Sequence, residues 1–302
     1  MENKLYDYQH DYMVRGTAAN AQIRAFAVTS RGVAEYAREA HDLSPVACAA
    51  LGRTMSGALM MADMLKGPSD LLTIQIDGDG PLGRLIVTAD NHGGVKGYVE
   101  HPDVELAPNA FGHLDVGGAV GRGTLTVIRD LGLRDPYVGQ TDLQTGEIAE
   151  DLTYYFAVSE QTPSSVGLGV LVDRQNNCIR ESGGFIVQLM PNAEEETIQK
   201  LEENLKGIDP VTKMLSDGDT PERMLDRVLE GLDPVITDKS PVAFVCNCSK
   251  EKYERALVLL GEDEVSALAA EGEPIEIVCR FCGKKYVFSP DEMQEILRRT
   301  KE

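Results

Sequence analysis

Apolar and polar residues alternate in short runs over roughly the first two thirds of the chain, which is the pattern of strands with one buried face. Turn sequences such as Asp77-Gly78-Asp79-Gly80 and Gln175-Asn176-Asn177 separate several of the runs, so the pattern predicts antiparallel hairpins. The predicted strands span residues 12–16, 23–28, 71–76, 85–88, 95–99, 124–128, 166–172 and 184–189.

Helical patterns interrupt these strands at three places. The first covers residues 30–41, and the second is expected to begin with Ser44 as its N-cap, to have Pro45 in its first turn and to end before Gly67. At 148–159 three consecutive aromatic residues suit a strand, but the acidic residues before them favour the start of a helix. Residues 1–192 are therefore expected to form one α+β domain with a mixed, largely antiparallel sheet.

The pattern changes after Pro191. Residues 192–240 contain 13 acidic and 6 basic residues, and their apolar positions recur at helical spacing. Such short helices are marginal in water, so each needs a surface to pack against. We therefore expect residues 193–240 to be an acidic, marginally stable helical linker.

Residues 241–302 contain four of the six cysteines, as the pairs Cys246/Cys248 and Cys279/Cys282. The first pair follows an apolar run, and on an extended strand residues i and i+2 point to the same face. The second pair lies between two short predicted strands, and Gly283 suits the sharp turn of a zinc knuckle. The spacing predicts a small C-terminal domain in which four thiolates hold one metal ion.

Zinc is the preferred ion for this site. A four-cysteine iron site has the same donor set, and spacing does not separate the two. Four sulfur ligands leave no open coordination position, which argues against a zinc hydrolase. Helices are expected at about 250–260 and after the capping-box residue Ser289.

Composition narrows the function. The net charge of −20 opposes unspecific binding to nucleic acid or anionic lipid, and the metal domain is itself acidic. The polar N-terminus does not look like a signal peptide, and no apolar stretch is long enough to span a membrane, so we expect a cytoplasmic protein. Paired cysteines in that setting indicate metal or redox chemistry rather than a disulfide scaffold.

Other motifs are given structural interpretations. The Gly-x-Gly-x-x-Gly match that starts at Gly78 is followed by a strand rather than a helix, so we interpret it as a hairpin loop and not a dinucleotide site. Cys48 and Cys178 have no close basic partner and are expected to be buried small apolar residues. The methionines of the second helix are expected to fill the core. No catalytic centre is recognised.

The cysteine module at the end of an acidic chain resembles the 33-kilodalton redox-regulated heat-shock chaperone family. Gly80-Pro81-Leu82-Gly83-Arg84, Ile128-Arg129-Asp130 and Tyr155-Phe156 with the following Ser159-Glu160-Gln161 are similar to that family as well. The resemblance implies that the four cysteines hold Zn²⁺ while reduced and that the protein is then inactive. It also implies that oxidation forms the disulfides Cys246–Cys248 and Cys279–Cys282, releases the zinc and unfolds the linker. The protein would then be a dimeric, ATP-independent holdase for unfolding client proteins.

The residues give this mechanism separate support. A module of about sixty residues rarely gains more than ~3–5 kcal/mol from its own core, whereas structural zinc contributes roughly 10–16 kcal/mol. If the linker packs on that module, loss of the metal removes its support. The hypothesis is that clients then bind apolar faces of the linker, at Leu201, Leu205, Leu225 and Val228.

Two other classes of function remain open from the residues alone. One is a zinc-ribbon protein that binds nucleic acid or serves transcription, although its metal domain would be unusually acidic. The other is a thiol–disulfide oxidoreductase that uses Cys279 and Cys282, although such sites usually place the first cysteine at a helix N-terminus rather than between strands. The expectation is a binding protein and not an enzyme.

Overall fold

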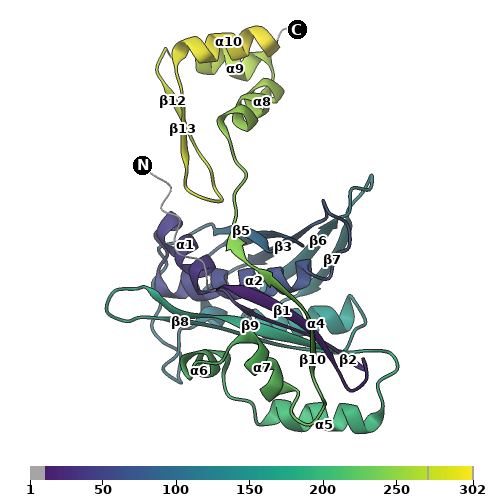
Figure 1. Ribbon diagram of the computed structural model, residues 1–302. Coiled ribbons are helices and arrows are strands. Elements are labelled where there is room, and N and C mark those ends of the chain that lie inside the picture. Colours follow the sequence, from purple (N-terminus) through teal and green to yellow (C-terminus); the bar gives the residue numbers. More distant parts are fainter. Residues whose placement is uncertain (1–10, 271, 301–302) are drawn as a thin grey trace. The chain divides into compact units, whose positions relative to one another are not determined.

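The computed structural model describes residues 11–270 and 272–300 of the 302-residue chain. They divide into two compact units, and the division falls between Val245 and Cys246. No helix in the described part of the chain has the length and hydrophobicity that a membrane span requires. The architecture is α+β with largely antiparallel sheets, as the sequence predicts (Figure 1).

Two sheets form the frame of the first unit. The first sheet has five antiparallel strands in the order β10-β1-β2-β9-β8, and the second has six in the order β11-β5-β4-β3-β6-β7. The strands of the first sheet are β10 (Val235–Pro241), β1 (Tyr12–Ala18), β2 (Ile23–Thr29), β9 (Ile179–Leu189) and β8 (Ser164–Val172). Those of the second are β11 (Ala243–Phe244), β5 (Gly94–Val99), β4 (Arg84–Asp90), β3 (Leu71–Gly78), β6 (Gly123–Asp130) and β7 (Tyr137–Asp142). Every strand predicted in residues 1–192 is present, and β7 was not predicted.

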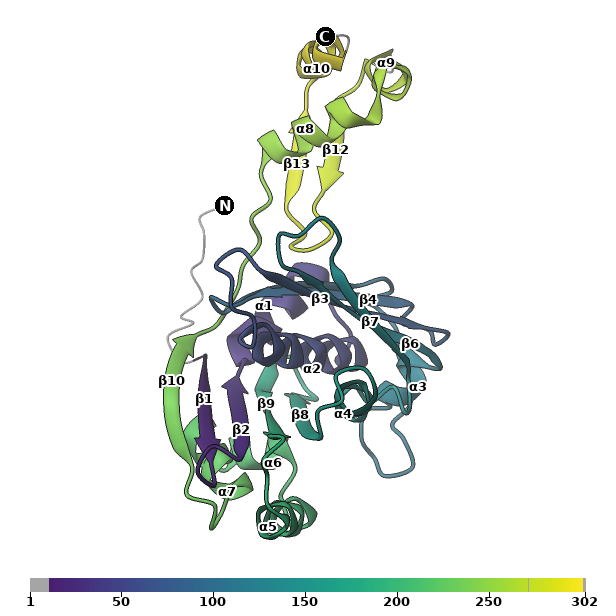
Figure 2. The ribbon, with the colours of Figure 1, turned by 90° about the vertical axis from the view of Figure 1, so that its right-hand side faces the viewer.

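The helix α2 (Pro45–Ala62) lies between the two sheets (Figure 2). Nearly all of its residues are buried, because it is apolar on all sides. The Ser44 side chain accepts a hydrogen bond from the Ala47 N–H at 3.4 Å, as expected of an N-cap. Met55, Met60 and Met61 are core residues. The other helices of this region are α1 (Arg31–His41), α3 (Val116–Val120) and α4 (Ala149–Val158).

The Gly-x-Gly-x-x-Gly stretch connects two strands and not a strand and a helix. Strands β3 and β4 pair in an antiparallel register that runs from Leu71↔Asp90 to Asp77↔Arg84. The stretch is the turn of that hairpin, and Gly83 has a φ of +64° there. The hairpin interpretation is confirmed.

The acidic linker packs on the first sheet. Its helices α5 (Glu195–Lys206), α6 (Val211–Ser216) and α7 (Pro221–Val228) cover the face of that sheet opposite α2 (Figure 2). They share one apolar cluster with strands β1, β2 and β9. The surface that supports these short helices is therefore the first sheet, which the sequence did not reveal.

The linker is helical as expected, but its end is a strand that was not predicted. β10 pairs with β1, and the polar side chains of Tyr12, Glu222 and Lys239 join the two strands to α7. The Tyr12 hydroxyl donates to Glu222 Oε2 at 2.7 Å, and Lys239 Nζ lies 3.0 Å from Glu222 Oε1. Lys239 also lies over the Tyr12 ring, 3.7 Å from its centroid.

The second unit is small and has its own core. Helices α8 (Lys250–Leu260), α9 (Glu262–Ala270) and α10 (Pro290–Thr300) pack with a two-stranded hairpin, β12 (Ile275–Val278) and β13 (Lys285–Phe288). The capping box before α10 is present: the Ser289 N–H donates to Glu292 Oε2 at 2.8 Å, and the Glu292 N–H donates to Ser289 Oγ at 3.3 Å. The helix α9 was not predicted.

Candidate metal centre

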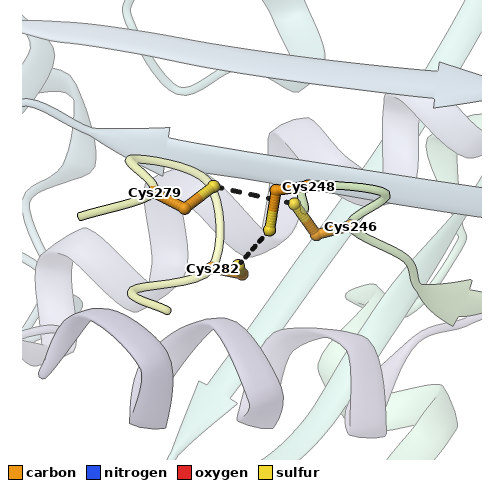
Figure 3. A group of neighbouring side chains, drawn as sticks. All are labelled: Cys246, Cys248, Cys279 and Cys282. Carbon is orange, nitrogen blue, oxygen red and sulfur yellow. Dashed lines mark hydrogen bonds between the residues drawn. The ribbon is translucent and has the colours of Figure 1, made fainter. Parts of the chain in front are cut away.

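Four cysteine sulfurs converge in the second unit (Figure 3). Cys246 and Cys248 lie in the segment that precedes α8, and Cys279 and Cys282 lie in the turn between β12 and β13. All four Sγ atoms are within 4.8 Å of one another. The contacts across the two pairs measure 3.8 Å for Cys246–Cys279 and 3.4 Å for Cys248–Cys282, and all four thiols are free.

This geometry fits a four-coordinate metal ion. An ion with Zn–S bonds of about 2.3 Å in a tetrahedron places its ligand sulfurs roughly 3.8 Å apart. The sulfur–sulfur distances are close to that value and much longer than the ~2.05 Å of a disulfide bond. Four soft sulfur donors can hold one thiophilic cation, and the set leaves no coordination position for a substrate.

The turn that carries the second pair has the form that the sequence predicts. The Gly283 N–H donates to the Cys279 carbonyl at 2.8 Å, and the Cys279 N–H donates to the Lys284 carbonyl at 2.9 Å. Gly283 has a φ of +69°, which glycine adopts at little cost. The turn brings Cys279 and Cys282 to one side.

The first pair departs from its predicted setting. β11 ends at Phe244, so Cys246 and Cys248 lie in irregular backbone and not on a regular strand. Ser249 follows them directly and caps α8, since its Oγ accepts a hydrogen bond from the Lys252 N–H at 3.3 Å. The helix start therefore fixes the chain direction just beyond Cys248.

Two tyrosines that the sequence analysis missed surround the sulfurs. The Tyr286 hydroxyl lies 3.2 Å from Cys248 Sγ and 3.0 Å from the Cys248 carbonyl, and it can donate to either. Tyr253 packs against Tyr286 with ring centroids 5.1 Å apart, and its hydroxyl is hydrogen-bonded to Cys279. Such hydroxyl donors orient sulfur ligands and offset part of their negative charge. The signal in the sequence is weak, because these contacts depend on how α8 packs on the hairpin.

Burial and hydrogen bonding act differently on the four thiols. Burial raises the pKa of Cys246 and of Cys282. Burial acts in the same direction at Cys279, but hydrogen bonds from the Tyr253 hydroxyl and from the N–H groups of Phe281 and Cys282 outweigh it and lower its pKa to about 6. A bound cation favours the thiolate form at all four positions, because its positive charge stabilises the negative sulfurs and offsets the cost of burying them.

The remaining cysteines lie apart from this cluster. Cys48 is buried in α2, and burial raises its pKa to about 12, so it is an unreactive core residue as expected. Cys178 is partly exposed in the turn before β9. The expectation that Cys178 is buried is therefore wrong, because the turn holds it at the surface, with its Sγ 3.8 Å from the Asn176 carbonyl.

The linker residues proposed for client binding are mostly covered. Leu201, Leu225 and Val228 are buried in the cluster against the first sheet, and Leu205 is partly buried at its edge. In this arrangement they face the molecule's own sheet.

Comparison with known proteins finds one protein family over nearly the whole length of the chain. The family model described as "Hsp33 protein" matches residues 11–289. The 33 kDa chaperonin of Agathobacter rectalis is 54% identical over 286 residues, which cover 95% of this chain and 99% of the relative. That of Lachnoclostridium phytofermentans is 53% identical over 291 residues, which cover 96% of this chain and 99% of the relative.

A solved structure gives the same result for the fold. The crystal structure of the 33 kDa chaperonin (heat shock protein 33 homolog) from Thermotoga maritima superposes with a TM-score of 0.89 at 38% identity. The match covers 96% of this chain and 98% of that one.

Proposed function

The chain belongs to the Hsp33 family of chaperones, and from this membership we propose that it is a redox-regulated, ATP-independent holdase. In the reduced state Cys246, Cys248, Cys279 and Cys282 would hold one Zn²⁺ per chain. Convergence of the four sulfurs within 4.8 Å is the observation that supports this proposal most strongly. Bound zinc would supply the charge that keeps the thiolates together and much of the folding free energy of the module.

The proposed switch is oxidation of the sulfurs. Formation of each disulfide removes two electrons from a pair of cysteine sulfurs, and one hydrogen peroxide accepts them and, with two protons, becomes two water molecules. We propose the pairs Cys246–Cys248 and Cys279–Cys282, in keeping with the family resemblance. Disulfide sulfurs no longer carry the thiolate charge that binds a cation, so oxidation and metal loss are coupled.

The hydrogen bond between Tyr253 and Cys279 favours oxidation at the Cys279 sulfur. The lowered pKa of Cys279, to about 6 through its hydrogen bonds despite burial, keeps this sulfur a thiolate at neutral pH even without a cation. The thiolate is the form of cysteine that attacks a peroxide oxygen. We therefore propose that Cys279 is the sulfur that reacts with peroxide once the cation dissociates, and that Cys282 resolves its sulfenic acid with release of water.

Function then requires the linker to leave its sheet. We propose that residues 1–192 act as the folded core, residues 193–240 as the releasable linker and residues 241–302 as the redox switch. Release would expose Leu201, Leu205, Leu225 and Val228 to unfolding client proteins. The acidic charge of the linker would keep the complex dispersed, and the oxidised protein would act as a homodimer.

One experiment tests the function. The reduced full-length chain is assayed for zinc with a chromophoric chelator and for suppression of light scattering by a chemically unfolded client enzyme. The sample is then oxidised with peroxide at mild heat and measured again, and finally treated with dithiothreitol. We expect about one zinc per chain before oxidation, and its release together with a gain of suppression afterwards. Equal suppression in the reduced and oxidised states would contradict the proposal.

A further inference from the structure

Residues 241–245, which we call the edge segment, form a weakly paired addition to the second sheet. They begin with Pro241, the last residue of β10, and directly precede Cys246. β11 within them pairs with β5 in parallel at only two positions, Ala243↔Gly94 and Phe244↔Val95. The Ala243 N–H donates to the Gly93 carbonyl at 2.9 Å, and the Val245 N–H donates to the Val95 carbonyl at 2.8 Å. So short a strand depends on its side chains to stay in place.

Those side chains alternate like a strand with one buried face. Val242 is 2% exposed and Phe244 is 8% exposed, whereas Val245 is 51% exposed. The Phe244 ring stacks on Tyr36 of α1 with centroids 4.5 Å apart and an interplanar angle of 26°. The site that the segment occupies therefore accepts an extended chain with apolar residues at every second position, one of them aromatic.

The backbone of the sheet is shaped for a close neighbour at this point. Gly93 has a φ of +84°, and a Cβ built on it would lie 2.1 Å from the Pro241 carbonyl oxygen. The Val242 N–H donates to the Asp11 carbonyl at 3.1 Å. The residue before β1 thus provides a polar contact to the edge segment, and the second sheet leaves no room for a larger residue at position 93.

Strand β5 extends beyond the part that β11 covers. Within the described residues, the pairing with β11 stops at Val95, whereas β5 continues to Val99. The Glu100 N–H donates to the Arg84 carbonyl at 2.9 Å, so the even-numbered residues turn their backbone groups to β4. The odd-numbered Gly97 and Val99 then turn theirs to the outer edge. Gly97 and Val99 are themselves buried, so the pairing offered to an incoming strand is that of the β5 residues that the edge segment now covers.

We propose that, after activation, the edge of β5 and the aromatic surface of Tyr36 bind an extended apolar segment of an unfolded client by strand addition. The inference rests on the proposed function, because both neighbours of the edge segment, the linker and the cysteine module, are the parts that activation releases. The occupant takes the place of Phe244 with an aromatic or bulky apolar side chain. Backbone hydrogen bonds supply binding that is independent of sequence, which suits a chaperone with many clients.

The chain's own edge segment provides the probe. A fluorescein-labelled peptide Pro-Val-Ala-Phe-Val copies residues 241–245, and a second peptide replaces its phenylalanine with serine. Fluorescence anisotropy is measured with the full-length chain, reduced and zinc-loaded or oxidised. We expect the oxidised chain to bind the first peptide at least tenfold more tightly than the reduced chain does, and to bind the serine peptide about tenfold more weakly than the first.

Variants of the full chain locate the binding. Tyr36→Ala is expected to weaken peptide binding by about two- to tenfold, in line with the ~0.5–1.5 kcal/mol of an aromatic pair, and Tyr36→Phe to restore it. Tyr137→Ala is the matched control, because Tyr137 is an exposed tyrosine on β7 at the opposite edge of the same sheet. Circular dichroism establishes that each variant is folded, and Tyr36→Phe keeps the test valid if the alanine variant is not.

Hydrogen exchange of residues 94–99 separates the outcomes. We expect slow exchange in the reduced chain, faster exchange after oxidation, and renewed protection when unfolded client is added. Suppression of aggregation without that renewed protection overturns this inference and leaves the proposed function intact. Protection that appears without client and increases with chain concentration also overturns it, because a second copy then occupies the edge. Loss of suppression in every state contradicts the proposed function itself.

Discussion

Leu225→Ala tests whether packing on the first sheet is what holds the linker. Leu225 lies in α7, has no exposed surface and belongs to the cluster formed with β1, β2 and β9. Truncation of a buried leucine to alanine costs about 2–5 kcal/mol. The helix has only eight residues and would be marginally stable alone. The lost free energy therefore weakens the packing of the linker on the first sheet.

The expected effect on the linker is large. Because each 1.4 kcal/mol changes an equilibrium tenfold, the detached fraction should increase by about 30-fold to a few thousand-fold. Under reducing conditions the variant should therefore show faster hydrogen exchange over residues 195–232 and partial suppression of client aggregation. Its zinc content should stay near one per chain, since the cysteines are unchanged.

Leu259→Ala is the control, because Leu259 is 86% exposed in α8 and its truncation should cost little. Unchanged exchange over the linker in Leu225→Ala would refute the claim that the cluster with the first sheet holds it. Faster exchange without any suppression would show that release of the linker alone does not create a client-binding surface.

Three further outcomes are expected. Tyr286→Phe removes a hydroxyl donor from Cys248 and should weaken zinc binding about 10- to 100-fold in chelator competition, whereas Tyr137→Phe should not. Although burial opposes it, hydrogen bonding from a tyrosine and a lysine lowers the pKa of Glu222 to about 2, so its stabilising contribution is complete above about pH 4.5 and is lost as the pH falls toward 2. Urea unfolding at a series of acidic pH values should show that loss, and Glu222→Gln should flatten it. Ser289→Ala removes an N-cap and should lower the melting temperature of the cysteine module, at a cost of about 0.5–2 kcal/mol.

The parts of the structure that the sequence predicted are those governed by local chemistry. The core strands follow from alternation, and α2 follows from Ser44, Pro45 and a continuous apolar run. The turn at Gly283 follows from the need for positive φ between two short strands. The convergence of the four cysteines follows from their close pairing in a small module, because such a set is typical of sulfurs that hold one metal ion.

The parts that the sequence did not predict depend on distant partners. β10 carries charged residues and proline and is almost wholly exposed, so it lacks the alternation of a buried strand, and only its pairing with β1 defines it. β7 is likewise an exposed edge. The tyrosines at the sulfurs could not be assigned, because their hydroxyls reach Cys248 and Cys279 only after α8 has packed on the hairpin.

The turn at Gly93 restricts which sequences this fold tolerates. With the Pro241 carbonyl 2.1 Å from where a Cβ would stand, every other residue at position 93 must displace the passing chain. In a saturation mutagenesis library of the full-length chain, we expect this codon to remain nearly invariant. In a library truncated after residue 240 the steric part of that constraint is absent, and asparagine, which tolerates positive φ, should become acceptable.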